Sequence, residues 1–116
     1  MEGGELMDGQ SSVDVVRFDG ELDVSRRREL ESALRQASGG RGVLIDFAAV
    51  SYVDSTVIAE LLRFRNEAVA NGRLVAVLIG SPQLARIIEY AGLSQAFAVF
   101  DDRGSALTYL AGTSST

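Results

Sequence analysis

Two uninterrupted apolar runs constrain the fold of this chain more than any other feature. They are Val43-Leu44-Ile45 and Leu74-Val75-Ala76-Val77-Leu78-Ile79. A strand with one wetted face alternates apolar and polar residues, whereas a strand of a parallel sheet that is covered on both faces has nearly continuous apolar sequence. The two runs therefore predict the central strands of a parallel sheet with helices on both faces.

The segment between the two runs predicts a crossover helix. From residue 55 to residue 70, apolar residues recur at helical spacing and form a wide stripe, and Asn71-Gly72 follows as a stop signal. A helix that joins two parallel strands packs back onto the sheet as a right-handed crossover. Strand, helix and strand thus form one unit of an α/β sheet.

The N-terminal third predicts a hairpin and a helix. Residues 13–18 and 21–24 are short apolar pieces separated by Gly20, a pattern typical of two strands joined by a turn. Ser25 can then cap a helix whose apolar positions repeat at helical spacing until Gly39-Gly40 ends it.

The C-terminal third predicts two further helices around a short strand. Ser81 and Pro82 are a typical N-cap and first helical residue, and Gly92 suits the left-handed position that closes the helix. A strand is expected over 97–100, and Asp101 or Asp102 can cap the last helix. The predicted order is ββαβαβαβα.

These elements predict an α/β fold with a mixed, largely parallel sheet of four to five strands and about four helices. With 116 residues, the chain has room for one packed core and not for two. We expect a single domain over residues 13–111, with a flexible N-terminus at 1–12 and a flexible C-terminus at 112–116.

Missing residue types exclude most enzyme chemistry. The chain contains no His, Cys, Trp or Lys, and all 11 of its basic residues are Arg. Disulfides, cysteine or histidine ligation of metals, His-based acid–base catalysis and Schiff-base chemistry are therefore impossible. No glycine-rich nucleotide motif occurs, and no paired-carboxylate constellation stands out. We expect a protein that is not an enzyme and that holds no metal or cofactor.

The net charge of the chain argues against two classes of partner. A net charge of −5 disfavours nucleic acid or an anionic membrane surface, because both would repel the protein. Residues 1–12 lack the cationic start and apolar run of a secretory signal, and no stretch approaches the roughly 20 apolar residues that span a bilayer. A soluble cytoplasmic protein is expected.

The segment Asp54-Ser55-Thr56 is the most informative candidate site. It lies where the chain leaves the strand at 43–47 and enters the helix at 55–70, the edge at which open α/β sheets usually bind ligands. Free backbone N–H groups at a helix start favour an anion, including a phosphate carried by Ser55. The same three residues also read as an ordinary helix cap, and the residues alone leave both interpretations open.

Three segments resemble one known family. They are F-D-G-E-L-D at 18–23, V-L-I-D-F-x-x-V-S-Y-V-D-S-T-V-I-A-E-L-L at 43–62 and S-P-x-L-x-R-I-I-E-Y-A-G-L at 81–93. In order and spacing, this set is similar to the STAS domain of bacterial anti-sigma factor antagonists. The resemblance covers nearly the whole folded region and implies the STAS fold.

The resemblance implies a switch. In that family, the serine after the aspartate of the D-S-[ST] motif is phosphorylated by a partner serine kinase that is itself the anti-sigma factor. By position this is Ser55, preceded by Asp54 and followed by Thr56, while Glu21 and Asp23 match positions of the kinase-binding surface. The implied partners are this kinase, which binds the unphosphorylated protein, and a phosphatase that resets Ser55.

The chain departs from the family after the acceptor serine. The family usually continues with G-L-G, whereas this chain has Val57-Ile58-Ala59. The β-branched side chains stiffen the first helical turn, and we expect Val57 and Ile58 to add apolar surface for a partner. This change makes Ser55 a weaker substrate or selects a different partner.

Two other functions are possible for this architecture, and the sequence disfavours one of them. A STAS domain can also act constitutively, as a scaffold in a signalling assembly or as an accessory subunit of a transporter. A two-component receiver shares the α/β architecture, but its chemistry normally uses a lysine near the phosphoryl site, and this chain has none.

Overall fold

The computed structural model describes residues 13–37 and 39–111, so the expected flexible segments at 1–12 and 112–116 lie outside the described residues. In chain order the elements are β1 (Val13–Leu22), the short 3₁₀ turn η1 (Val24–Arg26), α2 (Arg27–Gln36), β2 (Gly42–Val53), α3 (Ser55–Ala70), β3 (Leu74–Ile79), α4 (Pro82–Tyr90), α5 (Leu93–Ala96), β4 (Ala98–Phe100) and α6 (Arg103–Leu110).

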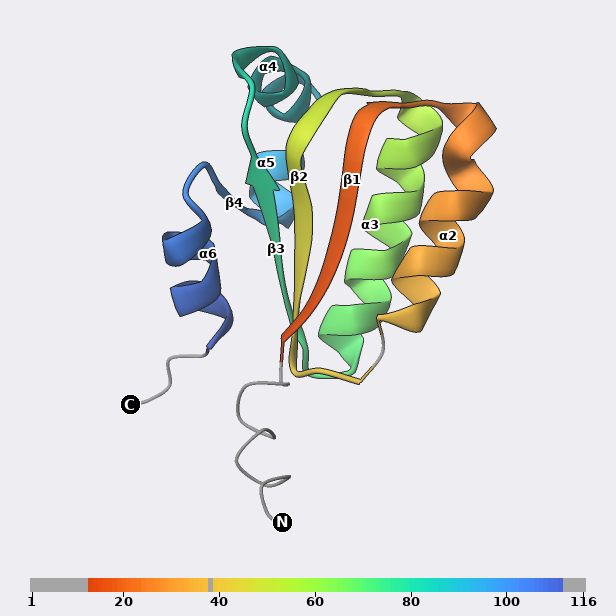
Figure 1. Cartoon of the computed structure of the whole chain (residues 1–116). Helices are drawn as coiled ribbons and strands as arrows, with labels where there is room; N and C mark the ends of the chain where they lie inside the picture. The colour runs from red at the N-terminus through yellow and green to blue at the C-terminus, as the bar shows by residue number, and fades with distance from the viewer. Residues whose placement is uncertain (1–12, 38, 112–116) are drawn as a thin grey trace.

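The described strands form one parallel sheet in the order β1-β2-β3-β4 (Figure 1). The α/β class is confirmed. The two apolar runs are the central strands, β2 and β3, and β3 has the predicted bounds. The other central strand, β2, is longer than the sequence indicated. It runs from Gly42 to Val53 and ends just before α3 begins.

The predicted N-terminal hairpin is wrong. Residues 13–22 form a single strand, β1, which pairs in parallel with β2 along its whole length. Gly20 has a positive φ of 75°, but this conformation accompanies register shifts between Arg17 and Asp19 and between Gly20 and Glu21. A bulge of this kind bends a strand without reversing it, so the glycine that suggested a turn marks an irregularity in the strand.

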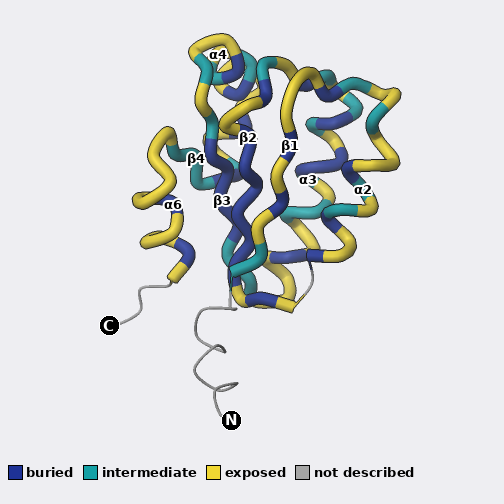
Figure 2. Tube along the Cα trace, viewed as in Figure 1, coloured by how far each residue is buried: buried dark blue, intermediate teal, exposed yellow. Residues whose placement is uncertain are grey.

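One face of the sheet carries most of the core. The helices α2, α3, α4 and α5 contribute to a single cluster of buried side chains on this face, together with Val43, Ile45 and Phe47 of β2. Figure 2 shows the central strands buried between their neighbours. The stripe predicted for α3 is confirmed, because Val57, Leu61 and Ala68 are buried there.

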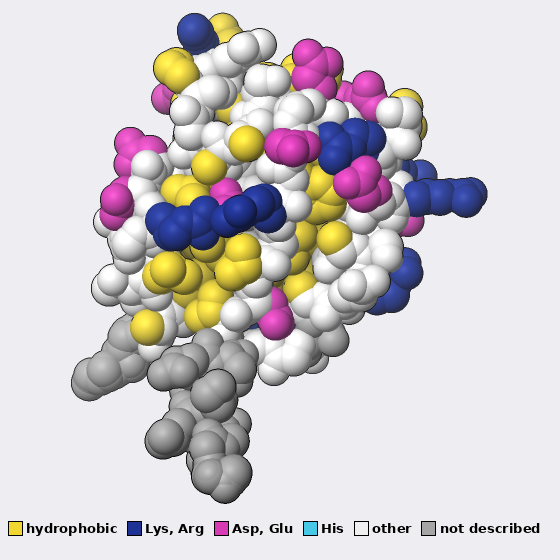
Figure 3. Space-filling view, in the orientation of Figure 1, with side chains coloured by type: hydrophobic (Ala, Val, Ile, Leu, Met, Phe, Trp, Pro, Cys, Tyr) yellow, Lys and Arg dark blue, Asp and Glu magenta, His cyan; other side chains and the backbone are white. Residues whose placement is uncertain are grey.

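The opposite face is covered by α6 over β2 and β3, and β1 is left open beside it. Leu44, Ala76 and Leu78 pack here against Ala106 and Leu110. Figure 3 shows basic side chains crossing an apolar area on this face.

On that face, a buried carboxylate of β2 connects β1 with α6. Asp46 of β2 is 2% exposed, and its Oδ2 accepts hydrogen bonds from Arg17 Nε at 3.1 Å and from Arg103 of α6. Burial by itself raises the pKa of Asp46, but hydrogen bonds from Arg103, from the Ala48 N–H and from Arg17 hold that pKa below its ordinary value. The ion pairs attach α6 to the sheet.

Side-chain caps start three of the helices. Asp54 accepts from Val57 N at 3.0 Å, Ser81 accepts from Leu84 N at 3.0 Å, and Asp102 accepts from Ser105 N at 2.8 Å. The predicted start of α4 and the choice of Asp102 for α6 are thus confirmed. Gly92 has the predicted left-handed backbone, with a φ of 72°. The short α5 that follows it was not predicted.

The expected cap at Ser25 is wrong. Asp23 is the N-cap, and it begins the 3₁₀ turn η1 rather than α2. Ser25 is the donor in this arrangement, because its backbone N–H and its hydroxyl both donate to Asp23 Oδ1, at 3.0 and 2.5 Å. A carboxylate oxygen has the lone pairs to accept both hydrogen bonds at once.

Candidate functional site

Ser55 is the first residue of α3, and its side chain is exposed. Asp54 before it has extended backbone and caps the helix through Val57 N. Within residues 13–37 and 39–111, no hydrogen bond involves the Ser55 hydroxyl or the backbone N–H groups of Ser55 and Thr56. Free N–H groups at the positive end of a 16-residue helix favour negative charge.

The parallel register brings the acidic end of β1 beside this helix start. Glu21 pairs with Tyr52, Leu22 pairs with Val53, and the Asp54 N–H donates to Leu22 O at 3.1 Å. Asp23 follows directly on Leu22. Two segments some 30 residues apart in sequence therefore form one surface, which we call the Ser55 surface and define by Glu21, Asp23, Asp54, Ser55 and Thr56.

Acidic groups dominate the Ser55 surface. Glu21 is exposed, while Asp54 and Asp23 are half-buried. Hydrogen bonds from the Ser25 hydroxyl and backbone N–H hold the pKa of the Asp23 carboxyl below its ordinary value. Asp23 is therefore firmly anionic at neutral pH, and a group approaching Ser55 meets negative charge from two strand ends.

The structure separates Val57 from the rest of the predicted surface. Val57 is 0% exposed and lies in the main core, so the expectation that its side chain offers apolar surface to a partner is wrong. Its position, two residues after Ser55 in the first turn of α3, turns it toward the sheet. Thr56 is half-buried, and Ile58 is half-buried and packs against the same core.

Arg26 is an organising residue that the sequence analysis did not single out. Its Nη1 donates to Asp19 O at 2.6 Å and to Glu21 O at 3.3 Å, and its other nitrogens bind both carboxylate oxygens of Glu29. Its guanidinium also lies 5.7 Å from the centre of the Phe18 ring. Arg26 thereby fixes the irregular end of β1 that presents Glu21. The i,i+3 spacing of Arg26 and Glu29 was the available signal.

Two exposed apolar side chains lie next to the acidic residues. Val24 in η1 is 62% exposed, and Tyr52 at the end of β2 is 39% exposed. Val24 follows Asp23 directly, and Tyr52 is the register partner of Glu21. Tyrosine is enriched where proteins meet. Val24 and Tyr52, and not Val57, are therefore the exposed apolar side chains beside the Ser55 surface.

Other features of the described residues do not add chemistry at Ser55. Among the described residues, no group of three or more acidic side chains is placed to hold a metal ion. A cavity of about 460 Å³ lies between α2 and α3 and does not include Ser55. No described helix is long and apolar enough to cross a membrane.

Comparison with known proteins places this geometry in context. A family model described as the STAS domain matches residues 6–106. The structure is similar to that of an anti-sigma factor antagonist from Mycobacterium paratuberculosis, with a TM-score of 0.77 and 26% sequence identity over 85% of this chain and 86% of that chain.

Two further solved structures share the fold. A sulfate transporter family protein from Wolinella succinogenes has a TM-score of 0.74 and 19% identity, covering 85% of this chain and 84% of that chain. The anti-sigma factor antagonist SpoIIAA in its unphosphorylated form has a TM-score of 0.58 and 20% identity, covering 87% and 91%.

Proposed function

The chain belongs to the STAS domain family, and from this we propose that it is an anti-sigma factor antagonist switched by phosphorylation at Ser55. In the unphosphorylated form, it binds a cytoplasmic serine kinase that is itself the anti-sigma factor, and the sigma factor is released. Phosphorylation ends the binding, and a phosphatase restores it. The protein acts by binding and carries out no reaction of its own.

One observation carries the proposal: the Ser55 hydroxyl is exposed and unengaged at the start of α3, within a surface built from two chain segments. A kinase must bring ATP's γ-phosphoryl group to this oxygen and remove its proton, which requires access from solvent. The Asp54 cap holds the backbone around Ser55 in place while the side chain stays free. The site is thus ordered and accessible at once.

The surroundings explain how one phosphate can change binding without unfolding the domain. A phosphoserine adds a charge of about −1.5 to −2. At the start of a helix this charge is favourable, so α3 remains folded. Against a partner, however, it adds to the charges of Glu21, Asp23 and Asp54, and a partner that fits the unphosphorylated surface would have to bury it. Arg26, the nearby arginine, is already bound to Glu29 and to the β1 backbone.

The residues that stand in place of the family glycines affect the choice of partner more than they affect access to Ser55. Because Val57 is packed into the core, its methyl groups do not stand over the Ser55 hydroxyl. Val24 and Tyr52 supply exposed apolar surface instead. We infer that the kinase partner has an apolar pocket beside its basic phosphoacceptor groove.

The comparisons support the proposal at the level of the family. The M. paratuberculosis structure is that of an anti-sigma factor antagonist. The SpoIIAA structure is that of an anti-sigma factor antagonist in its unphosphorylated form.

The experiment is a pull-down from native lysate with wild-type, Ser55→Ala and Ser55→Asp proteins, followed by mass spectrometry of bound chains and of Ser55. We expect wild type and Ser55→Ala to retain a serine kinase and Ser55→Asp to lose it. The kinase recovered in this way is then incubated with ATP and each variant, and phosphate is expected on wild type but not on Ser55→Ala.

A neighbouring hydroxyl provides the matched control. Thr56→Ala removes the adjacent hydroxyl and leaves Ser55 in place, so it should be phosphorylated as wild type is. Equal modification of Ser55→Ala and wild type would assign the acceptor to another residue. Equal capture of the kinase by Ser55→Asp and wild type would reject the switch.

A second function is favoured by the likeness to the W. succinogenes protein. In that case the domain would bind constitutively, as a scaffold or as an accessory subunit of a transporter. Size-exclusion chromatography of the native complex distinguishes the two: a large assembly or a membrane complex captured equally by all three variants supports this alternative.

A further inference from the structure

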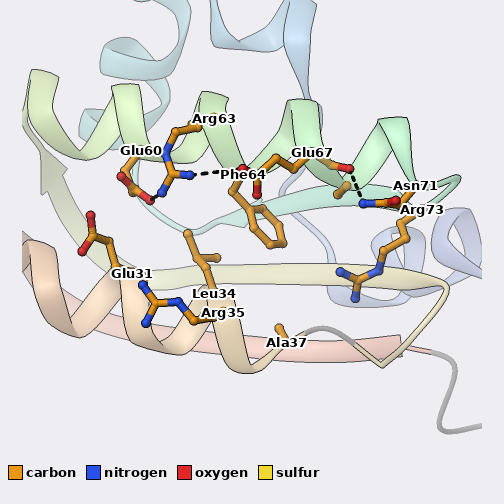
Figure 4. Close-up of a pocket in the computed structure, with 11 residues that line it drawn as sticks. Glu31, Leu34, Arg35, Ala37, Glu60, Arg63, Phe64, Glu67, Asn71 and Arg73 are labelled. Carbon is orange, nitrogen blue, oxygen red and sulfur yellow. Dashed lines mark hydrogen bonds and ion pairs between the residues drawn. The ribbon is translucent and has the colours of Figure 1, made fainter.

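The cavity between α2 and α3 has the size and wall chemistry of a small-molecule site. Its volume of about 460 Å³ lies in the lower part of the range of roughly 300–1,000 Å³ that is typical of ligand pockets. Figure 4 shows its lining, with α2 on one side and α3 on the other. It is separate from the Ser55 surface, and an inference about it does not depend on the proposed switch.

An apolar patch forms the middle of the cavity. Leu34 of α2 is buried, and Phe64 of α3 is half-buried and packs against the core. In Figure 4 the Phe64 ring projects into the space between the two helices. An apolar ligand group of a few carbon atoms could therefore leave water here.

Most charged groups around the cavity already have partners. Arg63 binds Glu60 and also donates to Glu67 at 3.2 Å. Arg73 donates to Asp14 at 3.0 Å and to Gly40 O at 2.6 Å. These ion pairs and hydrogen bonds hold the walls of the cavity in place and leave the groups little capacity to bind a ligand.

Glu60 and Arg35 retain binding capacity, and Glu31, which also lines this end of the cavity, is engaged only in an ion pair with Arg27 at 3.3 Å. The Glu60 side chain is 7% exposed, yet only its Oε2 accepts a hydrogen bond, from Arg63. Among the described residues nothing donates to Glu60 Oε1, and a buried carboxylate oxygen without a donor is costly. The Arg35 guanidinium likewise has no hydrogen bond or ion pair with any described residue. In Figure 4, Glu60 and Arg35 approach the same end of the cavity from opposite helices.

We propose that this cavity binds a small apolar α-amino acid. The ammonium group of the ligand donates to Glu60 Oε1, its carboxylate accepts from Arg35, and its side chain packs against Leu34 and Phe64. A simple carboxylate would leave the Glu60 oxygen without a donor, and a simple amine would leave Arg35 without an acceptor. A ligand that carries both charges on one carbon, with a short apolar group, satisfies all three features.

The test measures binding by ¹H–¹⁵N NMR titration of the full chain with three probes. L-Leucine carries both charges, 4-methylpentanoate lacks the ammonium, and 3-methylbutylamine lacks the carboxylate. We expect leucine to shift amides of α2 and α3 around the cavity in a saturable way. Loss of either charge should weaken binding by about tenfold or more, the usual scale for a hydrogen bond to a charged group.

Two variants assign the charges. Glu60→Gln should weaken leucine and leave 4-methylpentanoate unchanged, whereas Arg35→Gln should weaken leucine and leave 3-methylbutylamine unchanged. Arg28→Gln, an exposed arginine on α2 outside the cavity, is the control and should bind leucine as wild type does. Arg35 is exposed, so Arg35→Gln keeps the test decisive if Glu60→Gln fails to fold.

Three outcomes overturn the proposal. They are the absence of saturable shifts at millimolar leucine, equal affinity for leucine and for either probe with a single charge, and equal weakening by Arg28→Gln and Arg35→Gln. None of them bears on the capture of a kinase by the Ser55 surface.

Discussion

The starts of α3 and α4 are built alike and lie in different surroundings. Each helix follows a central strand of the sheet, and in each the N-cap side chain accepts from the backbone N–H three residues on, at 3.0 Å. In α3 the first helical residue is the exposed Ser55, and the end of β1 with Glu21 and Asp23 lies beside it. In α4 that position is Pro82.

The difference teaches that a cap motif does not by itself make a site. Both interpretations of Asp54-Ser55-Thr56, cap and acceptor, fit the same geometry: Asp54 is the cap, and Ser55 is left free by it. What distinguishes α3 is the second chain segment that the sheet register places next to it. The following predictions test this contrast, from the largest expected effect to the smallest.

The largest effect on partner binding should come from a negative charge placed at the start of α3, compared with the same charge placed at the start of α4. Ser55→Asp should weaken binding of the kinase partner by about 100-fold or more, because like charges brought together at an interface cost several kcal/mol. Ser81→Asp introduces the same charge at α4 but keeps a good N-cap, and it should leave binding unchanged. Calorimetry with the purified partner measures both, and similar losses in the two variants would remove the contrast.

A second prediction concerns the backbone that leads into α4. A Cβ at Gly80 would lie 2.3 Å from Ala48 O, so Gly80→Ala must displace the backbone after β3 from the backbone of β2. We expect a loss of about 1–3 kcal/mol in the free energy of unfolding, the usual cost of overpacking. Chemical denaturation measures it. Gly39→Ala, where the added Cβ meets nothing within 4 Å, is the control and should lose far less.

The caps themselves should contribute equally to stability. Asp54→Ala and Ser81→Ala should each lower the free energy of unfolding by about 1 kcal/mol, since each leaves a helix N–H without its acceptor. Asp54→Asn keeps an effective cap and should restore most of the loss. If Asp54→Asn nevertheless changes binding of the partner, the carboxylate charge acts at the interface separately from its role as a cap.

The smallest effect should be a titration at the Ser55 surface. The folded-state pKa of Asp23 lies below its unfolded value, so its contribution to stability is present above the unfolded pKa and is lost as pH falls through the folded pKa. Ser25→Ala removes the hydroxyl donor and should raise the pKa of Asp23 toward its ordinary value, near pH 4. NMR titration of the carboxyl carbon measures this, and an unchanged midpoint would assign the shift to another group.

Much of the fold could be predicted from local sequence. The apolar run at 74–79 and the helix at 55–70 have the predicted bounds, because burial on both faces and a wide helical stripe leave direct patterns in the sequence. The N-terminal region was mispredicted. Gly20 is compatible with a turn and with a bulge, and pairing with β2, a strand that begins some 20 residues later, decided between them.

The candidate site was predicted in part. The residues around Ser55 were singled out from their position and from a family resemblance, but their exposure was not. Val57 was expected on the surface and is in the core, because the orientation of α3 on the sheet determines which side of its first turn is buried. Arg26 was not singled out from the sequence, whereas in the structure its side chain holds the end of β1.

By itself, the sequence determined the α/β class, the helix start at Ser81, the candidate caps at Asp54 and at Asp101 or Asp102, and the absence of the side chains that most enzymes need. These properties depend on neighbouring residues or on composition. Only the tertiary structure decided that the acidic end of β1 lies beside Ser55, and that Arg35 and Glu60 line one cavity. Such neighbours are set by strand register and helix packing, which act between segments that are far apart in the chain.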